Sequence, residues 1–424
     1  MSATLSPSSW SSRARWAVPV IAVVGVVGAF AGPALLAGAA ADLPPLSVEQ
    51  LVAKVAAAEP GPMSGTVVYT AHLGLPEMPL TKLAGASPIN LLSGSSTLRV
   101  WTDGQARSRV SLLGQTSEYS VVHDDTQAWT YSSTDNAVTH WTLDPADAAR
   151  LAALGKQADA GTLPGTADLP TPSAAASSAL SLAQESSTIT LDAETTVAGR
   201  GAYQLVVSPK ATETLIARIV VAVDAKTYTP LRVQIWSTQD TKAPALEIGF
   251  TDVTFATPTD AVLAFSAPPG ATVTEKVVNL PDKALTPEAL TPSATPTPTP
   301  TESAPALPDG VTVHGSGWGT VLEVSGLNAA GKLADPSKAA AALGAASADA
   351  SAGAGLAGDL LSSSGSGAGS PMSGLDVGSL YQQLTTPVAG GRLLSSALVS
   401  VLLMDDGRVL VGAVPASTLQ ALAG

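Results

Sequence analysis

The stretch that decides the fold is RSRVSLLGQTSEYSVVHDDTQAWTYSSTDNAVTHWTL, residues 107–143. It holds four short runs in which apolar and polar side chains alternate, and a period of two places every second side chain on one face of a strand. The runs are separated by short segments rich in turn-forming residues, such as Asp124-Asp125 and Asp135-Asn136. Consecutive antiparallel strands are joined in this way, whereas parallel strands need a long crossover. The stretch therefore predicts a β-meander.

The same alternation extends to both sides and predicts about eleven strands between residues 64 and 255. The predicted strands are Ser64–Leu73, Ser96–Thr102, Arg107–Leu113, Glu118–His123, Gln127–Ser132, Val138–Leu143, Thr188–Val197, Ala202–Ser208, Leu215–Val223, Pro230–Ser237 and Ala245–Phe255. Three short one-sided helices interrupt them: one capped by Ser47, one from Asp144-Pro145 to Gly155, and one after Thr171-Pro172. Because a one-sided helix buries its apolar stripe, we expect these helices to lie against the sheet. The fold class is α+β.

Composition limits the partners. The 424 residues are 45% hydrophobic but only 13% charged, with a formal net charge of −13. An acidic chain of this kind has no stripe of Lys and Arg that could displace counterions from phosphates, which argues against a nucleic-acid partner. The cysteine count is zero, so disulfides, thiolate metal sites and a lipid-modified cysteine are all excluded.

The N-terminal segment, residues 1–41, has the layout of a membrane-targeting signal. Arg13 and Arg15 precede an uncharged stretch at 17–41 with a continuous apolar core at 20–30. Ala37-Gly38-Ala39 supplies the small residues that a signal peptidase needs, although the same stretch could be retained as a membrane anchor. Both outcomes export the chain and place the remainder on the outer side of a membrane.

Composition also divides the rest of the chain. Residues 42–278 carry the strand pattern, and residues 279–308 are a stiff Pro/Thr-rich linker. Residues 309–424 predict a small β-hairpin module, interrupted by a low-complexity Ala/Gly/Ser segment at 329–374. In this module we expect one or two strands around Trp318, a strand at 393–403, and another at 409–414. A tight turn joins the last two strands, and a helix begins at Pro415. This apolar final hairpin needs covering, either by pairing near Trp318 or by docking on the main sheet.

Signatures of catalysis are absent from the sequence, which contains neither a Gly-x-Ser-x-Gly elbow nor a His-Glu-x-x-His helix. The four histidines do not fall at the spacings of a local metal site, and Asp124 and Asp125 beside His123 are explained by a turn. A glycine pattern at 353–358 lies in low-complexity sequence without a preceding strand. We therefore predict no catalytic residues, no metal and no cofactor.

The aromatic side chains make up only 4% of the chain, yet most of them fall on predicted strands. Core packing is one explanation. The other is that they line an apolar pocket between a curved sheet and a thin helical cover, as a lipid site needs. On the second interpretation the candidate lipid-binding residues are Tyr69, Trp101, Trp129, Tyr131, Trp141 and Trp236.

Several phrases give the chain a resemblance to actinobacterial exported proteins related to the outer-membrane lipoprotein carrier LolA. They are Ser47-Val-Glu-Gln-Leu-Val, Ser64-Gly-Thr-Val-Val, Glu118-Tyr-Ser-Val-Val-His-Asp-Asp, Val197-Ala-Gly-Arg-Gly-Ala-Tyr, Val223-Asp-Ala-Lys-Thr and Met404-Asp-Asp-Gly-Arg-Val-Leu-Val-Gly-Ala-Val. The resemblance covers about residues 46–275 and the last thirty or so. It implies an unclosed half-barrel of about eleven strands, covered by helices, that holds acyl chains. Families of the same shape include mycobacterial lipid-binding lipoproteins and regulators of envelope-stress sigma factors.

The resemblance implies two functions. The first is an exported, non-enzymatic carrier that binds lipid or an acylated protein. The alternative is an envelope-sensing regulator that contacts a membrane protein through the hairpin Leu393–Val414. An exported hydrolase is a third hypothesis, which the absent motifs disfavour. The chain departs from its lipidated relatives because it has no cysteine for acylation and carries a Pro/Thr-rich spacer.

Overall fold

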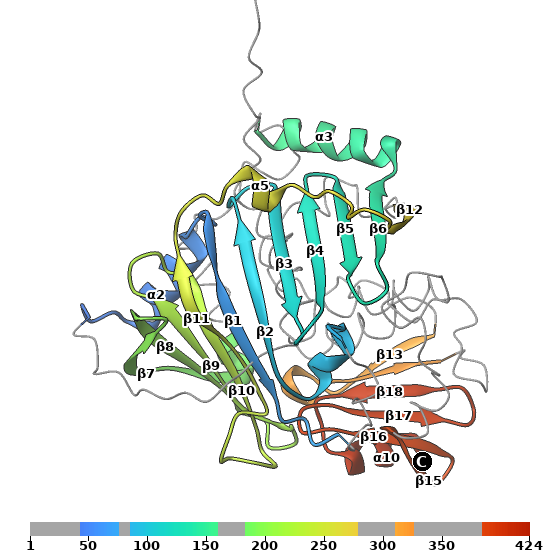
Figure 1. Cartoon of the computed structure of the whole chain (residues 1–424). Coiled ribbons are helices and arrows are strands. Elements are labelled where there is room, and N and C mark those ends of the chain that lie inside the picture. Colours follow the sequence, from blue (N-terminus) through green and yellow to red (C-terminus); the bar gives the residue numbers. More distant parts are fainter. Residues whose placement is uncertain (1–42, 76–84, 160–182, 279–309, 326–383) are drawn as a thin grey trace, which may run out of the picture.

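A computed structural model describes residues 43–75, 85–159, 183–278, 310–325 and 384–424 (Figure 1). Four predicted features lie outside these residues: the targeting segment, the helix after Thr171-Pro172, the linker and the low-complexity segment. Among the helices of the described ranges, none is long and apolar enough to cross a membrane.

The strands form two sheets, one of twelve strands and one of six. The large sheet consists of β1 (Met63–Ala71), β2 (Gly94–Thr102), β3 (Arg107–Leu113), β4 (Glu118–Asp124), β5 (Gln127–Ser132), β6 (Ala137–Leu143), β7 (Ser187–Val197), β8 (Arg200–Pro209), β9 (Ile216–Asp224), β10 (Pro230–Ser237), β11 (Leu246–Thr254) and β12 (Thr272–Val278). The small sheet consists of β13 (Val311–His314), β14 (Val321–Val324), β15 (Thr386–Val388), β16 (Gly391–Ser395), β17 (Ser400–Met404) and β18 (Val409–Gly412). The helical elements are α2 (Val48–Ala57), η2 (Pro88–Leu92), α3 (Pro145–Asp159), α5 (Asp260–Leu263), η5 (Gly317–Gly319) and α10 (Ala416–Ala423).

The α+β prediction is confirmed: the large sheet is curved, almost entirely antiparallel and unclosed (Figure 1). Its order is β12-β6-β5-β4-β3-β2-β1-β11-β10-β9-β8-β7, so β1–β6 and β7–β11 are two meanders that meet where β1 pairs with β11. Asp125 and Asn136, which form turns of the first meander, adopt positive φ, a conformation that Asp and Asn tolerate better than most residues. The register shifts by one residue at this junction, where Thr66 pairs with Asp252 and Val67 with Phe250.

Two predictions about strands were wrong. The alternating pattern predicts no strand after residue 255, whereas β12 follows and pairs with β6 in parallel. The segment from residue 255 crosses the sheet, with α5 against β2 and β3, before β12 begins, so this edge strand is not part of either meander. The predicted strand at 393–403 is two strands, β16 and β17. The backbone reverses between them, where the Ser396 N–H donates to the Val399 carbonyl at 2.9 Å.

Cross-strand register divides the large sheet into two faces. Partners directly opposite each other in a ladder share a face, whereas neighbours along a strand alternate. We call the side that bears Tyr69 the Tyr69 face and the side that bears Gln234 the Gln234 face. The helix α2 packs on the Tyr69 face, where Leu51 contacts Tyr203 and Val223. The segment that contains α5 packs on the Gln234 face, where Arg109 donates to the Val262 carbonyl.

The helix α2 begins as predicted, at the cap residue Ser47. The Ser47 hydroxyl accepts a hydrogen bond from the Gln50 N–H at 3.2 Å, and the Gln50 side chain accepts one from the Ser47 N–H at 2.9 Å. This reciprocal pair satisfies two of the amide groups that a helix N-terminus leaves unbonded. Just before the helix, the Tyr203 hydroxyl donates to the Pro44 carbonyl at 2.7 Å, which ties the start of α2 to β8.

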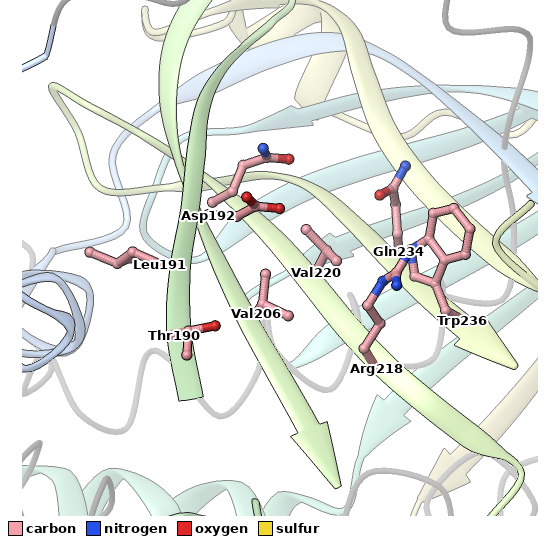
Figure 2. A pocket seen from close by; sticks show the side chains of 9 residues that line it. Thr190, Leu191, Asp192, Val206, Arg218, Val220, Gln234 and Trp236 are labelled. Atoms are coloured by element: carbon pink, nitrogen blue, oxygen red, sulfur yellow. The ribbon is translucent and has the colours of Figure 1, made fainter. Parts of the chain in front are cut away.

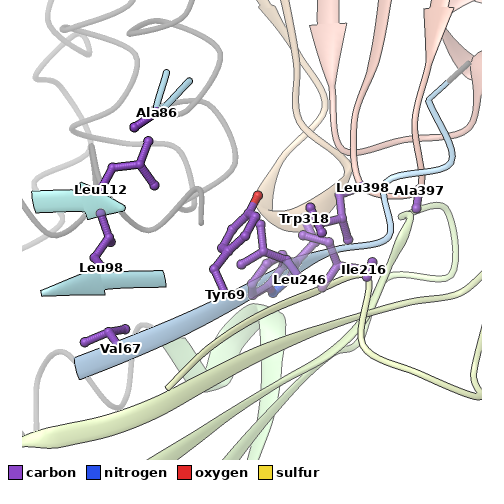
Figure 3. Close-up of a cluster of buried hydrophobic side chains, with 12 residues drawn as sticks. Val67, Tyr69, Ala86, Leu98, Leu112, Ile216, Leu246, Trp318, Ala397 and Leu398 are labelled. Carbon is purple, nitrogen blue, oxygen red and sulfur yellow. The ribbon is translucent and has the colours of Figure 1, made fainter. Parts of the chain in front are cut away.

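The small sheet meets the large sheet at the ends of several strands, and both expectations for the final hairpin are met. The strand β18 pairs with β14, which follows Trp318 in the chain. At the same time Trp318, Ala397 and Leu398 join the largest core cluster beside Ile216 and Leu246 of the large sheet (Figure 3). The two sheets therefore share one hydrophobic core.

Polar contacts reinforce this joint between the sheets. The Trp318 indole N–H donates to the Ser187 hydroxyl at 2.7 Å, and the Ser237 hydroxyl donates to the Ala397 carbonyl at 2.6 Å. The Leu215 N–H donates to the Ala413 carbonyl at 2.8 Å. The helix α10 covers one face of the small sheet, where its fully buried Leu419 packs against residues such as Leu402 and Leu410.

Candidate functional site

The Tyr69 face carries two apolar rows that each cross six adjacent strands, β1, β11, β10, β9, β8 and β7. The first row is Tyr69, Ile248, Val233, Val221, Leu205 and Leu191. The second row is Ala71, Leu246, Ile235, Ile219, Val207 and Ile189. Every member is apolar or aromatic, and the Tyr69 hydroxyl is the one polar side-chain group in either row.

Much of this surface is only half-buried. Tyr69, Ala71 and Leu246 are buried, but Ile235, Ile219 and Val207 are partly exposed at the margin of the core. The other half of the face continues the pattern through Val100 and Val110, which are also partly exposed, to Val121, which is 37% exposed. These apolar side chains therefore pack against the core and keep part of their area exposed to solvent.

The Gln234 face is different at the same positions. One row is Thr70, Glu247, Gln234, Val220, Val206 and Thr190, and the next is Val68, Gly249, Arg232, Ala222, Gln204 and Asp192. Charged and amide side chains interrupt both rows. The two faces of the same six strands therefore have opposite character, as a sheet with one solvated side requires.

A hollow of about 410 Å³ lies on the Gln234 face, between β7 and β10 (Figure 2). Its wall includes Asp192, Gln204 and Gln234, with the Arg218 guanidinium 4.2 Å from the centre of the Trp236 indole. Gln234 donates to Glu247 at 2.9 Å. Val206 and Val220 also line the hollow, but the charged and amide side chains around them make it a poor match for acyl chains, which gain free energy from apolar surroundings.

The six aromatic candidates do not share one site. Tyr69 and Trp141 lie on the Tyr69 face, whereas Trp101, Trp129, Tyr131 and Trp236 lie on the Gln234 face. Tyr69 is a core residue with 1% exposure, and its hydroxyl donates to the Leu91 carbonyl at 2.6 Å. Burial raises the pKa of Tyr69, so the hydroxyl keeps its proton and remains a donor.

Two aromatics of the Gln234 face, Trp129 and Trp236, stack against neighbouring side chains. Trp129 stacks on His140 at 4.8 Å between ring centres and on Phe265 at 5.7 Å, beneath the segment that contains α5. Trp101 and Tyr131 are half-buried on β2 and β5, and Trp236 lies under Arg218. Trp141, on the Tyr69 face, lies beneath the Lys276 ammonium, which is 4.7 Å from its ring centre.

The residues that sequence reasoning missed are the β-branched and aliphatic side chains of the two apolar rows. Their alternation is visible in the strand patterns, for example in residues 216–223 and 230–237. What the sequence does not show is that β1 pairs with β11, which aligns Tyr69 with Ile248 and joins the two meanders into one surface. The aromatic residues stand out in the sequence because they are rare, whereas the two apolar rows consist mainly of common aliphatic residues.

A partly buried ion pair joins the first residue of β8, Arg200, to the last residue of β9, Asp224. Arg200 donates to both oxygens of Asp224, at 2.5 Å and 3.0 Å, and Asp224 is 1% exposed. Burial by itself would raise the pKa of Asp224, but hydrogen bonds from Arg200, Thr227 and Lys226 outweigh it and hold the pKa below its ordinary value. The Lys226 and Thr227 N–H groups donate to the same carboxylate. These contacts stabilise the turn after β9 and give the Arg200–Asp224 pair a structural role.

A second carboxylate, Glu118, belongs to a polar cluster on the Gln234 face. Burial would raise its pKa, but hydrogen bonds from Ser120, Ser111 and Arg109 outweigh it, and the pKa lies below the ordinary value. A general base that works near neutral pH needs a raised pKa, so Glu118 is not suited to that role. Among the described residues, no group of three or more His, Asp or Glu side chains is placed to hold a metal ion.

The fold and its two unlike faces define a class: a curved, unclosed sheet with one apolar, partly covered side. No protein-family model matches the chain, and no curated protein matches its sequence. Solved structures with some likeness include the Pseudomonas aeruginosa MucA/MucB complex, at 15% identity and TM-score 0.38, over 88% of this chain and 96% of that chain.

Two further structures show a weaker likeness. An uncharacterized conserved protein from Thermus thermophilus is 14% identical with TM-score 0.30, over 54% of this chain and 98% of that chain. The LolA superfamily protein NE2245 from Nitrosomonas europaea is 8% identical with TM-score 0.19, over 52% of this chain and 99% of that chain. Identities and scores of this size assign neither a family nor an activity to this chain.

Proposed function

We propose that this is an exported, non-enzymatic protein that binds lipid or an acylated protein, with acyl chains against the Tyr69 face. The observation that carries the proposal is the pair of uninterrupted apolar rows over β1 and β7–β11, whose central members Ile219, Ile235 and Val207 are only half-buried. Each methylene removed from water gains about 0.8 kcal/mol. A chain of several methylenes laid across these rows would therefore bind without any polar recognition.

The helix α2 supplies a cover at one side of this surface. It contacts β8 and β9 through Leu51, and the partly buried Leu191, Leu205 and Val221 of the first row pack beneath it. Only Leu51 of the helix is fully buried, so most of its surface remains available to solvent or ligand. Movement of a short helix of this kind would control loading and release of a bound chain.

Neighbouring valines in β8 allow a matched test. Val207 points to the Tyr69 face and Val206 to the Gln234 face, and both are half-buried. Val207→Glu should lower uptake of a fluorescent acyl probe by about tenfold or more, because the carboxylate would have to be desolvated beside the chain. Val206→Glu should leave uptake unchanged. The milder pair Val207→Thr and Val206→Thr repeats the comparison if a charged variant fails to fold.

Native mass spectrometry of the protein purified from its own cell envelope provides the direct test. We expect co-purified lipid or an acylated peptide that is displaced by the probe. Finding neither, together with no probe uptake, would refute the proposal. Equal losses from the Val206 and Val207 variants would also count against it, since that result would place the effect in stability and not in the apolar face.

A specific observation favours a second function, contact with a membrane-protein partner through the hairpin Leu393–Val414. On the side of the small sheet that faces away from α10, Val313 is 39% exposed, and Val401 and Leu403 are partly exposed. Leu398 does not belong to this surface because it is buried in the joint. Under this alternative, Leu403→Asp should abolish capture of the partner while lipid uptake survives; loss of uptake alone would speak against it.

A further inference from the structure

Along one row of the Tyr69 face, the valines of β3 and β4 give way to threonines on β5, β6 and β12. A row that begins at Val110 and Val121 continues as Thr130, Thr139 and Thr274 on the next three strands. The change occurs without any shift in register. Thr130 and Thr274 are half-buried and Thr139 is 4% exposed, and we call these three residues the hydroxyl patch. A ligand that fits the whole surface has an apolar part and a polar part.

A second row, nearer the end of these strands, carries a full charge. It runs from Ser108 through His123, Ala128 and Trp141 to Lys276. In β1–β6 and β8–β12, Lys276 is the one paired Lys, Arg, Asp or Glu residue on the Tyr69 face. The charged residues of these strands otherwise point to the Gln234 face, as Arg109, Glu118 and Glu247 do. Glu194 of β7, at the opposite end of the sheet, accepts a hydrogen bond from the Leu43 N–H at 3.0 Å, near α2.

Lys276 is also positioned by its neighbour. Its ammonium lies 4.7 Å from the centre of the Trp141 ring, and both side chains are half-buried. No described carboxylate lies within salt-bridge distance of it, whereas His140 on the other face of β6 pairs with Glu275 at 2.7 Å. A cation held over an aromatic ring keeps its charge available for an anion on its open side.

The spacing fits an amphipathic molecule. Lys276 is three strands from the apolar residue Val121 on β4, which corresponds to about 14 Å at the usual separation of strands. From β4 the apolar surface continues across β3, β2 and β1 to the two long rows. An anionic group at Lys276 would thus be joined to a chain that crosses the hydroxyl patch before it reaches fully apolar surroundings.

We infer that the ligand of the Tyr69 face is a lipid with an anionic headgroup, carboxylate or phosphate, whose charge is bound by Lys276 beside Trp141. The inference rests on the proposed function. An edge-strand lysine can also simply prevent strands from pairing with another chain, and β12 is an edge strand. A lysine that only prevents strand pairing would give the protein no preference for an anionic lipid over an uncharged one. The experiment below measures this preference.

The test compares a pyrene-labelled fatty acid with its methyl ester, which has the same chain but no charge. The full chain should bind the acid about tenfold more tightly than the ester, the gain of one charge-assisted contact. Lys276→Met should remove this preference, and Lys276→Glu should reverse it. The matched control is Lys226→Met, which removes an exposed lysine in the β9–β10 turn and should leave the preference intact.

Other results would contradict the inference. Equal binding of acid and ester by the natural chain, or an acid preference that survives in Lys276→Met, would overturn the inference while leaving lipid binding in place. Binding of neither probe would overturn both proposals. If inorganic phosphate removed the acid preference at the concentration of the probe itself, Lys276 would be a site for a free anion and the lipid assignment would be wrong.

Discussion

Replacing Trp318 with alanine should weaken the packing between the two sheets in their shared core. Trp318 is 8% exposed, lies in the cluster that contains Leu246 and Leu398, and donates its indole N–H to Ser187, which is 3% exposed. Removing a buried Trp side chain costs about 3–5 kcal/mol, and the unpaired Ser187 hydroxyl adds to that cost. We expect Trp318→Ala to lower the free energy of unfolding by about 4 kcal/mol.

Urea unfolding followed by circular dichroism and by tryptophan fluorescence measures this quantity. Trp318→Phe keeps most of the buried area and should cost only about 1–2 kcal/mol, mainly the lost hydrogen bond. Val313→Ala, at an exposed position of the same small sheet, should cost less than about 0.5 kcal/mol. A loss below about 1 kcal/mol for Trp318→Ala, or separate unfolding of two units in the natural chain, would refute the shared core.

Two other predictions concern buried polar groups. Asp224→Asn should lower the free energy of unfolding by roughly 1.5–3 kcal/mol, because Arg200 loses its charged partner. Since the folded-state pKa of Asp224 lies below its unfolded value, its contribution is present above about pH 4 and is lost as the pH falls through the folded pKa. Urea midpoints measured between about pH 3 and 6 should fall less steeply with acid in the variant, and identical slopes would contradict this assignment. Tyr69→Phe should cost about 1–2 kcal/mol in thermal or urea unfolding through the unpaired Leu91 carbonyl, and an unchanged stability would show that water replaces the hydroxyl.

Local features of the fold could be predicted from the sequence because they depend on neighbours in the chain. The cap at Ser47, the turns at Asp125 and Asn136, and the strands that they separate are all set within a few residues. The pairing of β1 with β11 depends on contacts between residues far apart in sequence, and no local pattern announces it. The same is true of β12, whose partner β6 ends more than a hundred residues earlier.

The face of the sheet on which each candidate aromatic lies also depends on long-range pairing. Trp129 and Tyr131 could be placed on one face because they are two residues apart in one strand. Relating either of them to Tyr69 requires every register between β1 and β5, and a shift of one residue in any of these ladders would exchange the faces. For this reason the aromatic residues could be named as candidates from the sequence, but the surface to which each belongs could not.

The carrier and regulator hypotheses share a physical link in the core cluster. That cluster contains Trp318 and Leu398 from the small sheet together with Tyr69, and it continues outward to Ile219 and Val207 of the apolar rows. A ligand that repacks the half-buried end of this cluster acts on the same side chains that hold the small sheet in place. If the hairpin binds a partner, thermodynamic linkage requires each ligand to change the affinity of the other by the same factor. Measuring the affinity for the acyl probe with and without the captured partner therefore tests whether lipid binding and partner binding are coupled through this cluster. Equal affinities would mean that the two surfaces act independently.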